Sequence, residues 1–216
     1  MNRKIVFSGD GSPTLYVEEL NQHYHSLFGA RTESEHIFIH AGLDAMKKKD
    51  IHLLEVGFGT GLNAYLSFIS KKPEASIKYF SIEKYPLIRN EWEALNYFPS
   101  DDHYTETWKN IHICEWEKWN LIGEGFELFK TMCDFNQCDL PDGQDLIYFD
   151  AFSPDAQPEL WSAGNFNKLY SCMKPGGIMV TYSVKGIVKQ RLKDAGFQIE
   201  KLPGPPGKRQ ILRAIK

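Results

Sequence analysis

The sequence predicts an α/β fold in which helices cover both faces of a mostly parallel, doubly wound sheet. Short apolar segments alternate with segments of helical periodicity along most of the chain, and this alternation is typical of successive βαβ units. A glycine-rich turn follows one apolar strand and opens a helix. The last two strand candidates are joined by a loop of proline and glycine, which predicts an antiparallel hairpin at one edge of the sheet.

Each element follows from its own pattern. Strands are expected at 51–56, 77–83, 126–132, 145–150, 178–183, 197–202 and 209–215. Helices are expected at 62–71, 87–98 and 185–195, after the loop 151–158 as far as 170, and in one or two short segments between 101 and 125. Pro86 suits the first turn of a helix, and Gly196 is a typical stop signal.

The first fifty residues precede the alternating pattern. We interpret 1–50 as an N-terminal extension packed on the sheet, where it is able to cover a ligand, and 51–216 as the main domain. The extension contains a helix-like stretch near 16–28. The segment His36–His40 alternates like a strand, which would place both imidazoles on one face.

Composition narrows the class of protein. The chain has 216 residues, 42% hydrophobic and 25% charged, which suits one globular domain. With no run of about 18 apolar residues and no signal segment, we expect a cytoplasmic protein without a membrane partner. The four cysteines lack metal-site spacing, so no metal is expected. We expect a monomer or a weak homodimer.

Charge is distributed unevenly along the chain. Residues 184–216 hold nine Lys or Arg and two acids, about +7, so the remainder carries about −10 within a net charge of −3. Such a basic region has two interpretations: it holds a phosphate backbone, or it forms the solvated faces of a helix and a strand.

The glycine turn indicates the cofactor. Its spacing, Gly57-x-Gly59-x-Gly61, differs from the G-x-G-x-x-G pattern of dinucleotide sites. Glu55, two residues earlier, is well placed for the ammonium of a methionine moiety and poorly placed beside a pyrophosphate. The residues expected at this end of the cofactor are Glu55, Gly57, Gly59, Thr60, Gly61 and Asn63.

Acids at the ends of three further strands complete this prediction. Glu83 can accept from both ribose hydroxyls, Asp134 from an adenine amino group, and Asp150 lies at the fourth strand end. Ligands of such sheets bind at the carboxyl ends of the strands. The pattern favours S-adenosylmethionine over NAD, and hence a Rossmann-like class I methyltransferase fold.

The segment Asp150-Ala-Phe-Ser-Pro indicates a nitrogen acceptor. Methyl transfer requires an aligned nucleophile with a free lone pair. Asp150 would accept a hydrogen bond from an amine, and Phe152 would form a wall against the target base, so both are candidate catalytic residues. Trp161 has two interpretations, a substrate contact or a core residue at the start of a helix.

These motifs resemble the methyltransferase domain of the MnmC family. The resemblance rests on Leu54-Glu-Val-Gly-Phe-Gly-Thr-Gly-Leu-Asn63, on Ile82 to Leu87, on Asp150 to Pro154 with Trp161, and on the closing segment around Gly207-Lys208-Arg209. Tyr24-His25-Ser26 is similar to stand-alone members of the family. MnmC completes 5-methylaminomethyl-2-thiouridine at the tRNA wobble position and carries a second, FAD-dependent domain, which we do not expect in this protein.

The resemblance therefore implies only the last step, conversion of 5-aminomethyluridine to 5-methylaminomethyluridine. It also suggests that Lys185, Lys189, Lys208 and Arg209 contact tRNA phosphates while the base turns outward. Two alternatives stay open: a methyltransferase acting on a small molecule or a protein, and a catalytically silent cofactor-binding scaffold.

Overall fold

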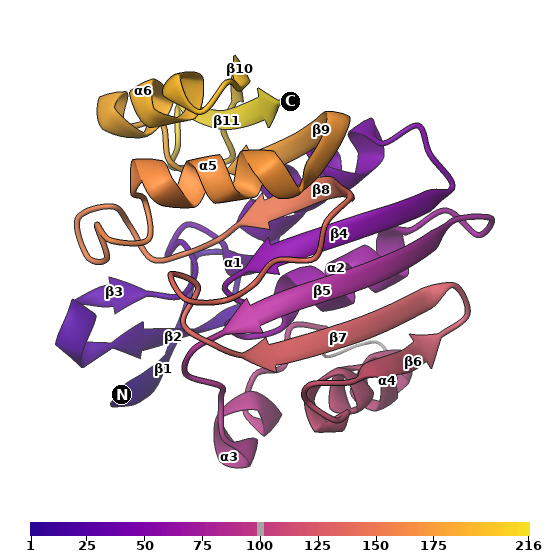
Figure 1. Ribbon diagram of the computed structural model, residues 1–216. Helices are drawn as coiled ribbons and strands as arrows, with labels where there is room; N and C mark the ends of the chain where they lie inside the picture. The colour runs from indigo at the N-terminus through magenta and orange to yellow at the C-terminus, as the bar shows by residue number, and fades with distance from the viewer. Residues whose placement is uncertain (99–101) are drawn as a thin grey trace.

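A central sheet organises the molecule, which is a computed structural model describing residues 1–98 and 102–216. Its strands are β4 (Asp50–Val56), β5 (Ser76–Glu83), β6 (Trp119–Gly123), β7 (Phe126–Met132), β8 (Gln144–Phe149), β9 (Met173–Thr181), β10 (Gln198–Pro203) and β11 (Gln210–Ile215). Within the described residues their order is β10-β11-β9-β8-β4-β5-β7-β6 (Figure 1). The strands from β9 to β7 in that order pair in parallel, which confirms the predicted fold class.

The outer strands run antiparallel to their neighbours. β10 and β11 form the expected hairpin, and β11 pairs with β9. At the other edge β6 pairs with β7. This strand was missed: the segment 101–125 holds a helix, α4 (Asp102–Ile113), followed by β6, and residue 101 lies outside the described residues. On β6 the large side chains of Trp119 and Leu121 are exposed, so the segment lacks the buried apolar face that marks a strand.

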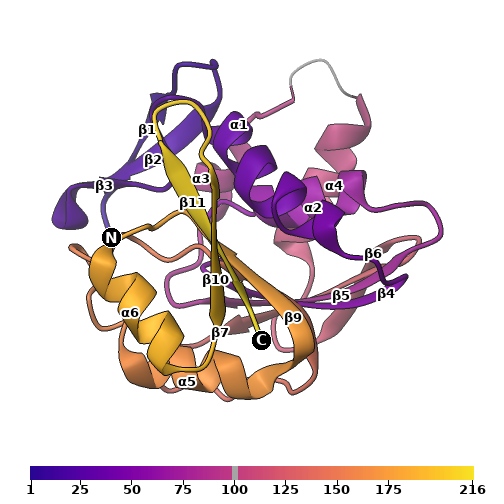
Figure 2. The ribbon, with the colours of Figure 1, turned by 90° about the horizontal axis from the view of Figure 1, so that it is seen from above.

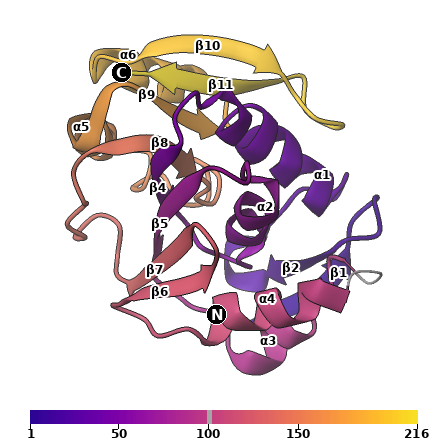
Figure 3. The ribbon, with the colours of Figure 1, turned by 90° about the vertical axis from the view of Figure 1, so that its right-hand side faces the viewer.

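Helices cover both faces of the sheet. On one face lie α1 (Ala30–Ser34), α2 (Leu62–Ser70) and α4, and on the other lie α5 (Ala163–Cys172) and α6 (Gly186–Asp194) (Figures 2 and 3). The predicted helix at 87–98 is shorter, α3 (Arg89–Glu93). Because β4 leads into α2 and the neighbouring β8 leads towards α5, the chain changes faces between these strands. Such a switch point is where parallel sheets bind ligands.

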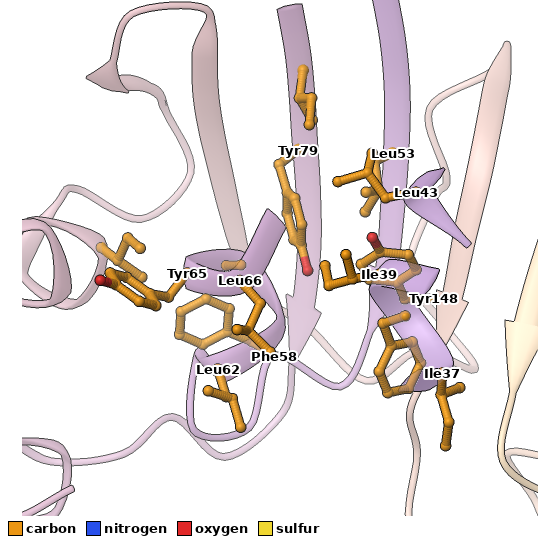
Figure 4. Packing of buried hydrophobic residues seen from close by; sticks show 14 of the residues in the cluster. Ile37, Ile39, Leu43, Leu53, Phe58, Leu62, Tyr65, Leu66, Tyr79 and Tyr148 are labelled. Atoms are coloured by element: carbon orange, nitrogen blue, oxygen red, sulfur yellow. The ribbon is translucent and has the colours of Figure 1, made fainter. Parts of the chain in front are cut away.

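The core has two layers, one on each face of the sheet. Leu53, Tyr79 and Tyr148 belong to the layer beneath α2, where Figure 4 shows them near Leu66 and Ile39. The next residues along the strands, such as Leu54, Ile147 and Phe149, belong to the layer beneath α5 and α6. Side chains that alternate between faces are buried on both, so the parallel strands carry apolar residues on both faces.

The N-terminal segment departs from the predicted elements. In place of a helix near 16–28, β1 (Arg3–Phe7), β2 (Pro13–Val17) and β3 (Gln22–His23) form a small antiparallel sheet, with a 3₁₀ turn η1 (Glu18–Leu20) between β2 and β3. The predicted strand at 36–40 is also wrong. A π-helical segment, η2 (Glu35–His40), continues α1, and a 3₁₀ turn, η3 (Leu43–Ala45), follows. Residues 37–39 are all buried, whereas a strand packed on one side buries only alternate residues.

No helix in residues 1–98 or 102–216 is long and apolar enough to cross a membrane.

Candidate functional site

The glycine turn after β4 brings two strand ends close together. Gly57, Gly59 and Gly61 adopt φ values of 95°, 53° and 77°, a region that side chains rarely tolerate. A Cβ atom on Gly57 would lie 2.6 Å from the carbonyl oxygen of Asp150. The backbone N–H of Gly57 donates to the carbonyl of Ile82 over 3.0 Å. At the switch point between β4 and β8 the turn therefore presents backbone atoms without side chains.

Two carboxylates occupy the ends of the next strands. Glu83, the last residue of β5, accepts hydrogen bonds from the backbone N–H groups of Gly59 and Tyr85, both at 2.8 Å. Asp134, just after β7, accepts from Lys84 Nζ at 2.8 Å and from the N–H of Asn136 at 3.0 Å. The bonds from Lys84 and Asn136 lower the pKa of Asp134. It is therefore ionised at neutral pH.

The carboxylate of Asp150 follows β8 and is half-buried. Its Oδ2 accepts a hydrogen bond from Asn63 Nδ2 over 2.9 Å. Burial raises the pKa of Asp150 to about 7, and the bond from Asn63 opposes that shift. A carboxyl that titrates near neutrality can exist with or without its proton at the same pH, as acid–base chemistry requires.

These groups open into one cavity of about 380 Å³ at the carboxyl ends of the strands. The predicted site residues that line this cavity are Gly57, Gly59, Thr60, Asn63, Glu83, Asp134, Asp150, Phe152 and Lys208. Outside its lining, as the structure describes it, are Glu55, Gly61, Trp161, Lys185, Lys189 and Arg209.

Glu55 lies behind the pocket. Its side chain is 0% exposed and shares a face of β4 with Leu53, in the core layer beneath α2. Ser81 Oγ donates a 2.6 Å hydrogen bond to it, and burial raises the pKa of Glu55 to about 8. Glu55 therefore lies outside the pocket lining, because strand alternation turns its carboxyl into the sheet layer. Its expected contact with the ammonium of the cofactor stays a prediction.

Gly61 also has a packing role. A Cβ atom there would lie 3.1 Å from the ring of Phe58 and 3.2 Å from His112. Its backbone forms the N-cap of α2.

Trp161 is a core residue. Its side chain is fully buried, with its ring 4.8 Å from that of Phe149. Its Nε1 donates a 2.7 Å hydrogen bond to the carbonyl of Phe152. Of the two interpretations, the structure therefore favours the core one, in which Trp161 holds the loop that carries Phe152.

The N-terminal segment supplies pocket residues that the strand-end pattern missed. The Tyr24 ring meets that of Phe152 edge-on, with centroids 5.1 Å apart, and His25 Nε2 lies 2.8 Å from Thr60 Oγ1. Glu33 of α1 also lines the pocket and forms a 2.8 Å ion pair with Lys208. The Tyr24-His25-Ser26 motif is the sequence signal that marks this region.

Several of the predicted basic residues are tied to acids. Lys208 pairs with Glu33 and Lys185 with Asp155, whereas Lys189 lies in a separate hollow and Arg209 is exposed. In the part of the chain that the structure describes, no group of three or more His, Cys, Asp or Glu side chains is arranged to hold a metal ion.

The fold and the glycine turn define a Rossmann-like methyltransferase, and comparison with known proteins agrees. Residues 104–216 match the model of a family described as S-adenosyl-L-methionine-dependent methyltransferase. The chain belongs to this family, and it is an S-adenosylmethionine-dependent methyltransferase.

The chain is similar to proteins named MnmC. The chain is 29% identical to the tRNA 5-methylaminomethyl-2-thiouridine biosynthesis bifunctional protein MnmC of Nitrosospira multiformis, over 92% of this chain and 35% of that protein. It is 31% identical to MnmC of Campylobacter fetus, over 97% and 35%. The crystal structure of MnmC2 from Aquifex aeolicus superposes with a TM-score of 0.80 at 26% identity, over 99% of this chain and 70% of that one. The predicted resemblance is confirmed, and the chain spans about a third of the curated relatives' length.

Proposed function

We propose that this methyltransferase acts on tRNA and converts 5-aminomethyluridine, with or without 2-thiolation, to 5-methylaminomethyluridine at the wobble position. The observation that carries the proposal is Asp150, a carboxylate with a pKa near neutrality beside the aromatic side chain of Phe152. The similarity to MnmC supports a tRNA substrate.

The residues present fit S-adenosylmethionine. The bare backbone of Gly57 and Gly59 leaves room at the strand ends that a Cβ would fill. Each oxygen of Glu83 accepts one backbone hydrogen bond and keeps lone pairs for a pair of ribose hydroxyls. Asp134 offers acceptors for an amino group, while Thr60 and Asn63 face the pocket from the start of α2. The cofactor supplies an electrophilic methyl group on its sulfonium.

Asp150 would orient the acceptor amine. A primary amine is mostly protonated at neutral pH and must lose a proton before its lone pair can attack the methyl group. The ionised Asp150 carboxylate, with a pKa near neutrality, would take up this proton and would aim the neutral amine through a hydrogen bond. Asn63 fixes the carboxylate by holding Oδ2, which leaves Oδ1 for the amine. The rings of Phe152 and Tyr24, packed edge to face, form an aromatic wall against which an extruded base can stack.

Nucleoside mass analysis tests the proposal. Purified protein would be incubated with S-adenosylmethionine and with tRNA from a strain that lacks the methylation step. The expected result is loss of 5-aminomethyluridine and gain of a nucleoside heavier by one methyl group. Methyl transfer to a protein or a small molecule in the same extract, with tRNA unchanged, would favour the alternative substrates. S-adenosylhomocysteine binding without any transfer would favour the silent scaffold.

A further inference from the structure

The basic charge of residues 184–216, all of which the structure describes, divides into two groups. Five of its nine Lys and Arg side chains bond to other parts of the protein: Lys185 to Asp155, Arg191 to the carbonyl of Trp161, Lys208 to Glu33, Arg213 to the carbonyl of Ala41 and Lys216 to that of Met173. The other four have no side-chain partner among the described residues: Lys189, Lys193, Lys201 and Arg209.

The three lysines among these four residues line one hollow of about 270 Å³ between α6 and β10, elements that lie side by side (Figures 1 and 3). Lys189 and Lys193 are four residues apart and so share a face of the helix. Lys201 and Ile199 are two apart and so share a face of the strand. We call this surface, formed by Lys189, Lys193 and Lys201 with Gly186, Gln190 and Ile199, the lysine groove.

No carboxylate among the described residues lines the lysine groove. Glu200 alternates to the other face of β10, where Arg213 donates to it over 3.3 Å. Asp194, which stands beside the groove, accepts a 2.8 Å hydrogen bond from Gln190. Three ammonium groups therefore face the hollow without a neutralising partner in it, and the surface attracts a polyanion.

We propose that the lysine groove binds phosphates of the tRNA backbone while the target base occupies the pocket. The inference rests on the proposed function and assigns its RNA-docking surface to Lys193 and Lys201 together with Lys189, and not to the acid-paired Lys185 and Lys208.

Position favours RNA over a lipid surface as the occupant. Tyr182 lines the pocket at the end of β9, and the chain reaches Gly186 of the groove a few residues later. Helix α6 thus begins beside the pocket, and Lys189 and Lys193 follow along the helix as it runs back from the carboxyl-end edge of the sheet. An RNA whose base enters the pocket would carry its neighbouring backbone across this edge, and lysine ammonium groups serve as point contacts for phosphates.

A matched pair of triple variants tests the proposal. One replaces Lys189, Lys193 and Lys201 with alanine. The control replaces Lys47, Lys49 and Lys72, three exposed lysines that flank the starts of β4 and β5, at the opposite edge of the sheet from the pocket. Both variants remove three positive charges, so any difference in their affinity for tRNA is due to where the lysines lie on the protein.

The measurement is the Kd for unmodified tRNA transcript at several salt concentrations. The groove variant should bind on the order of tenfold more weakly, and the slope of log K against log salt should flatten by about 2 to 3, one unit for each lost phosphate contact. The control should behave like the wild type. A Lys→Arg triple at the groove positions should retain affinity, and S-adenosylhomocysteine binding should be unchanged in every variant.

Equal tRNA affinity of the groove and control variants overturns the inference. So does loss of binding to phosphatidylglycerol vesicles by the groove variant while its tRNA binding persists. Should the alanine triple fail to fold, the Lys193→Gln/Lys201→Gln double variant gives the same comparison. Because binding is scored without methyl transfer, groove-dependent tRNA binding by a wild type that transfers no methyl overturns only the proposed function.

Discussion

Asn63 donates its side-chain amide to Oδ2 of Asp150 over 2.9 Å, and this bond joins the first turn of α2 to the end of β8. The two residues are far apart in sequence and meet because β4 and β8 are neighbours in the sheet. Burial alone would make the Asp150 carboxyl a weaker acid than it is, and the amide offsets part of that effect. Asn63 thus positions Asp150 and adjusts its pKa.

The pKa of Asp150 predicts how activity depends on pH. The carboxylate form accepts the hydrogen bond of the amine, so kcat/KM should rise with pH and show an inflection near pH 7. Asp150→Asn should lower kcat/KM by roughly 100-fold and remove that inflection. Methyl transfer assayed from pH 5.5 to 9 checks both. An inflection near 7 that persists in Asp150→Asn would assign the titration to another group.

Asn63→Ala provides the complementary test. Removing the donor should shift the inflection to higher pH, because Asp150 then loses the hydrogen bond that most strongly opposes the effect of burial on its pKa. An unshifted inflection would show that the bond does not influence the titration of Asp150.

The turn at Gly57 should not tolerate alanine. Gly57→Ala combines a positive φ with a 2.6 Å approach of Cβ to the carbonyl of Asp150, so it should abolish S-adenosylhomocysteine binding. Gly176 has a similar φ of 76° and open space around it. Gly176→Ala should therefore lower the unfolding free energy only by the cost of a left-handed alanine, about 1 to 2 kcal/mol. It should bind S-adenosylhomocysteine normally. Urea unfolding and calorimetric titration of both variants make the comparison.

Burial of Glu55 predicts a fall in stability as pH rises. The folded-state pKa of about 8 is above the ordinary value of 4.5, so the folded protein holds a proton that the unfolded chain releases. Its stabilising contribution is complete below pH 4.5 and is lost as pH rises through 8. Glu55→Gln, which is neutral, should remove the part of the fall between pH 7 and 8 in urea unfolding. A slope in that window equal to that of the wild type would contradict the assignment.

Glu55→Ala separates the hydrogen bond from the charge. It leaves the buried hydroxyl of Ser81 without its acceptor and should cost about 1 to 3 kcal/mol of unfolding free energy at pH 6. Glu55→Gln, which keeps an acceptor, should cost less.

Substitution of Trp161 should lower the rate of methyl transfer without changing the affinity for substrate. Trp161→Phe removes the donor to the carbonyl of Phe152, so the loop beside Asp150 loses a constraint. Because small displacements of a reacting group are costly, kcat should fall roughly 10-fold to 100-fold. The Kd values for tRNA and S-adenosylhomocysteine should stay unchanged. A weakened tRNA Kd with unchanged kcat would restore the interpretation of Trp161 as a substrate contact.

Local pattern was sufficient for four of the parallel strands, whereas β9 begins five residues before its expected start. The ranges expected for β4, β5, β7 and β8 agree with the structure to within a residue at each end, because strands buried on both faces are rich in apolar residues. The N-terminal elements were not predictable in this way. The alternation of 36–40 extends over only five residues, which fits a short strand and a helical turn equally, and packing against α2 and β9 decides between them.

The residues of the candidate site also fall into those that local pattern predicts and those that it does not. The amino-acid pattern alone predicts the fold class, the glycine turn and the acids Glu83, Asp134 and Asp150, because the carboxyl ends of parallel strands meet at one edge of the sheet. Tertiary packing is needed to place Glu55 and Trp161 in the core and Tyr24 and Glu33 in the pocket lining, and to pair some lysines and leave others unpaired. Those outcomes depend on which side chains meet across distant segments, and neither spacing nor composition records such contacts.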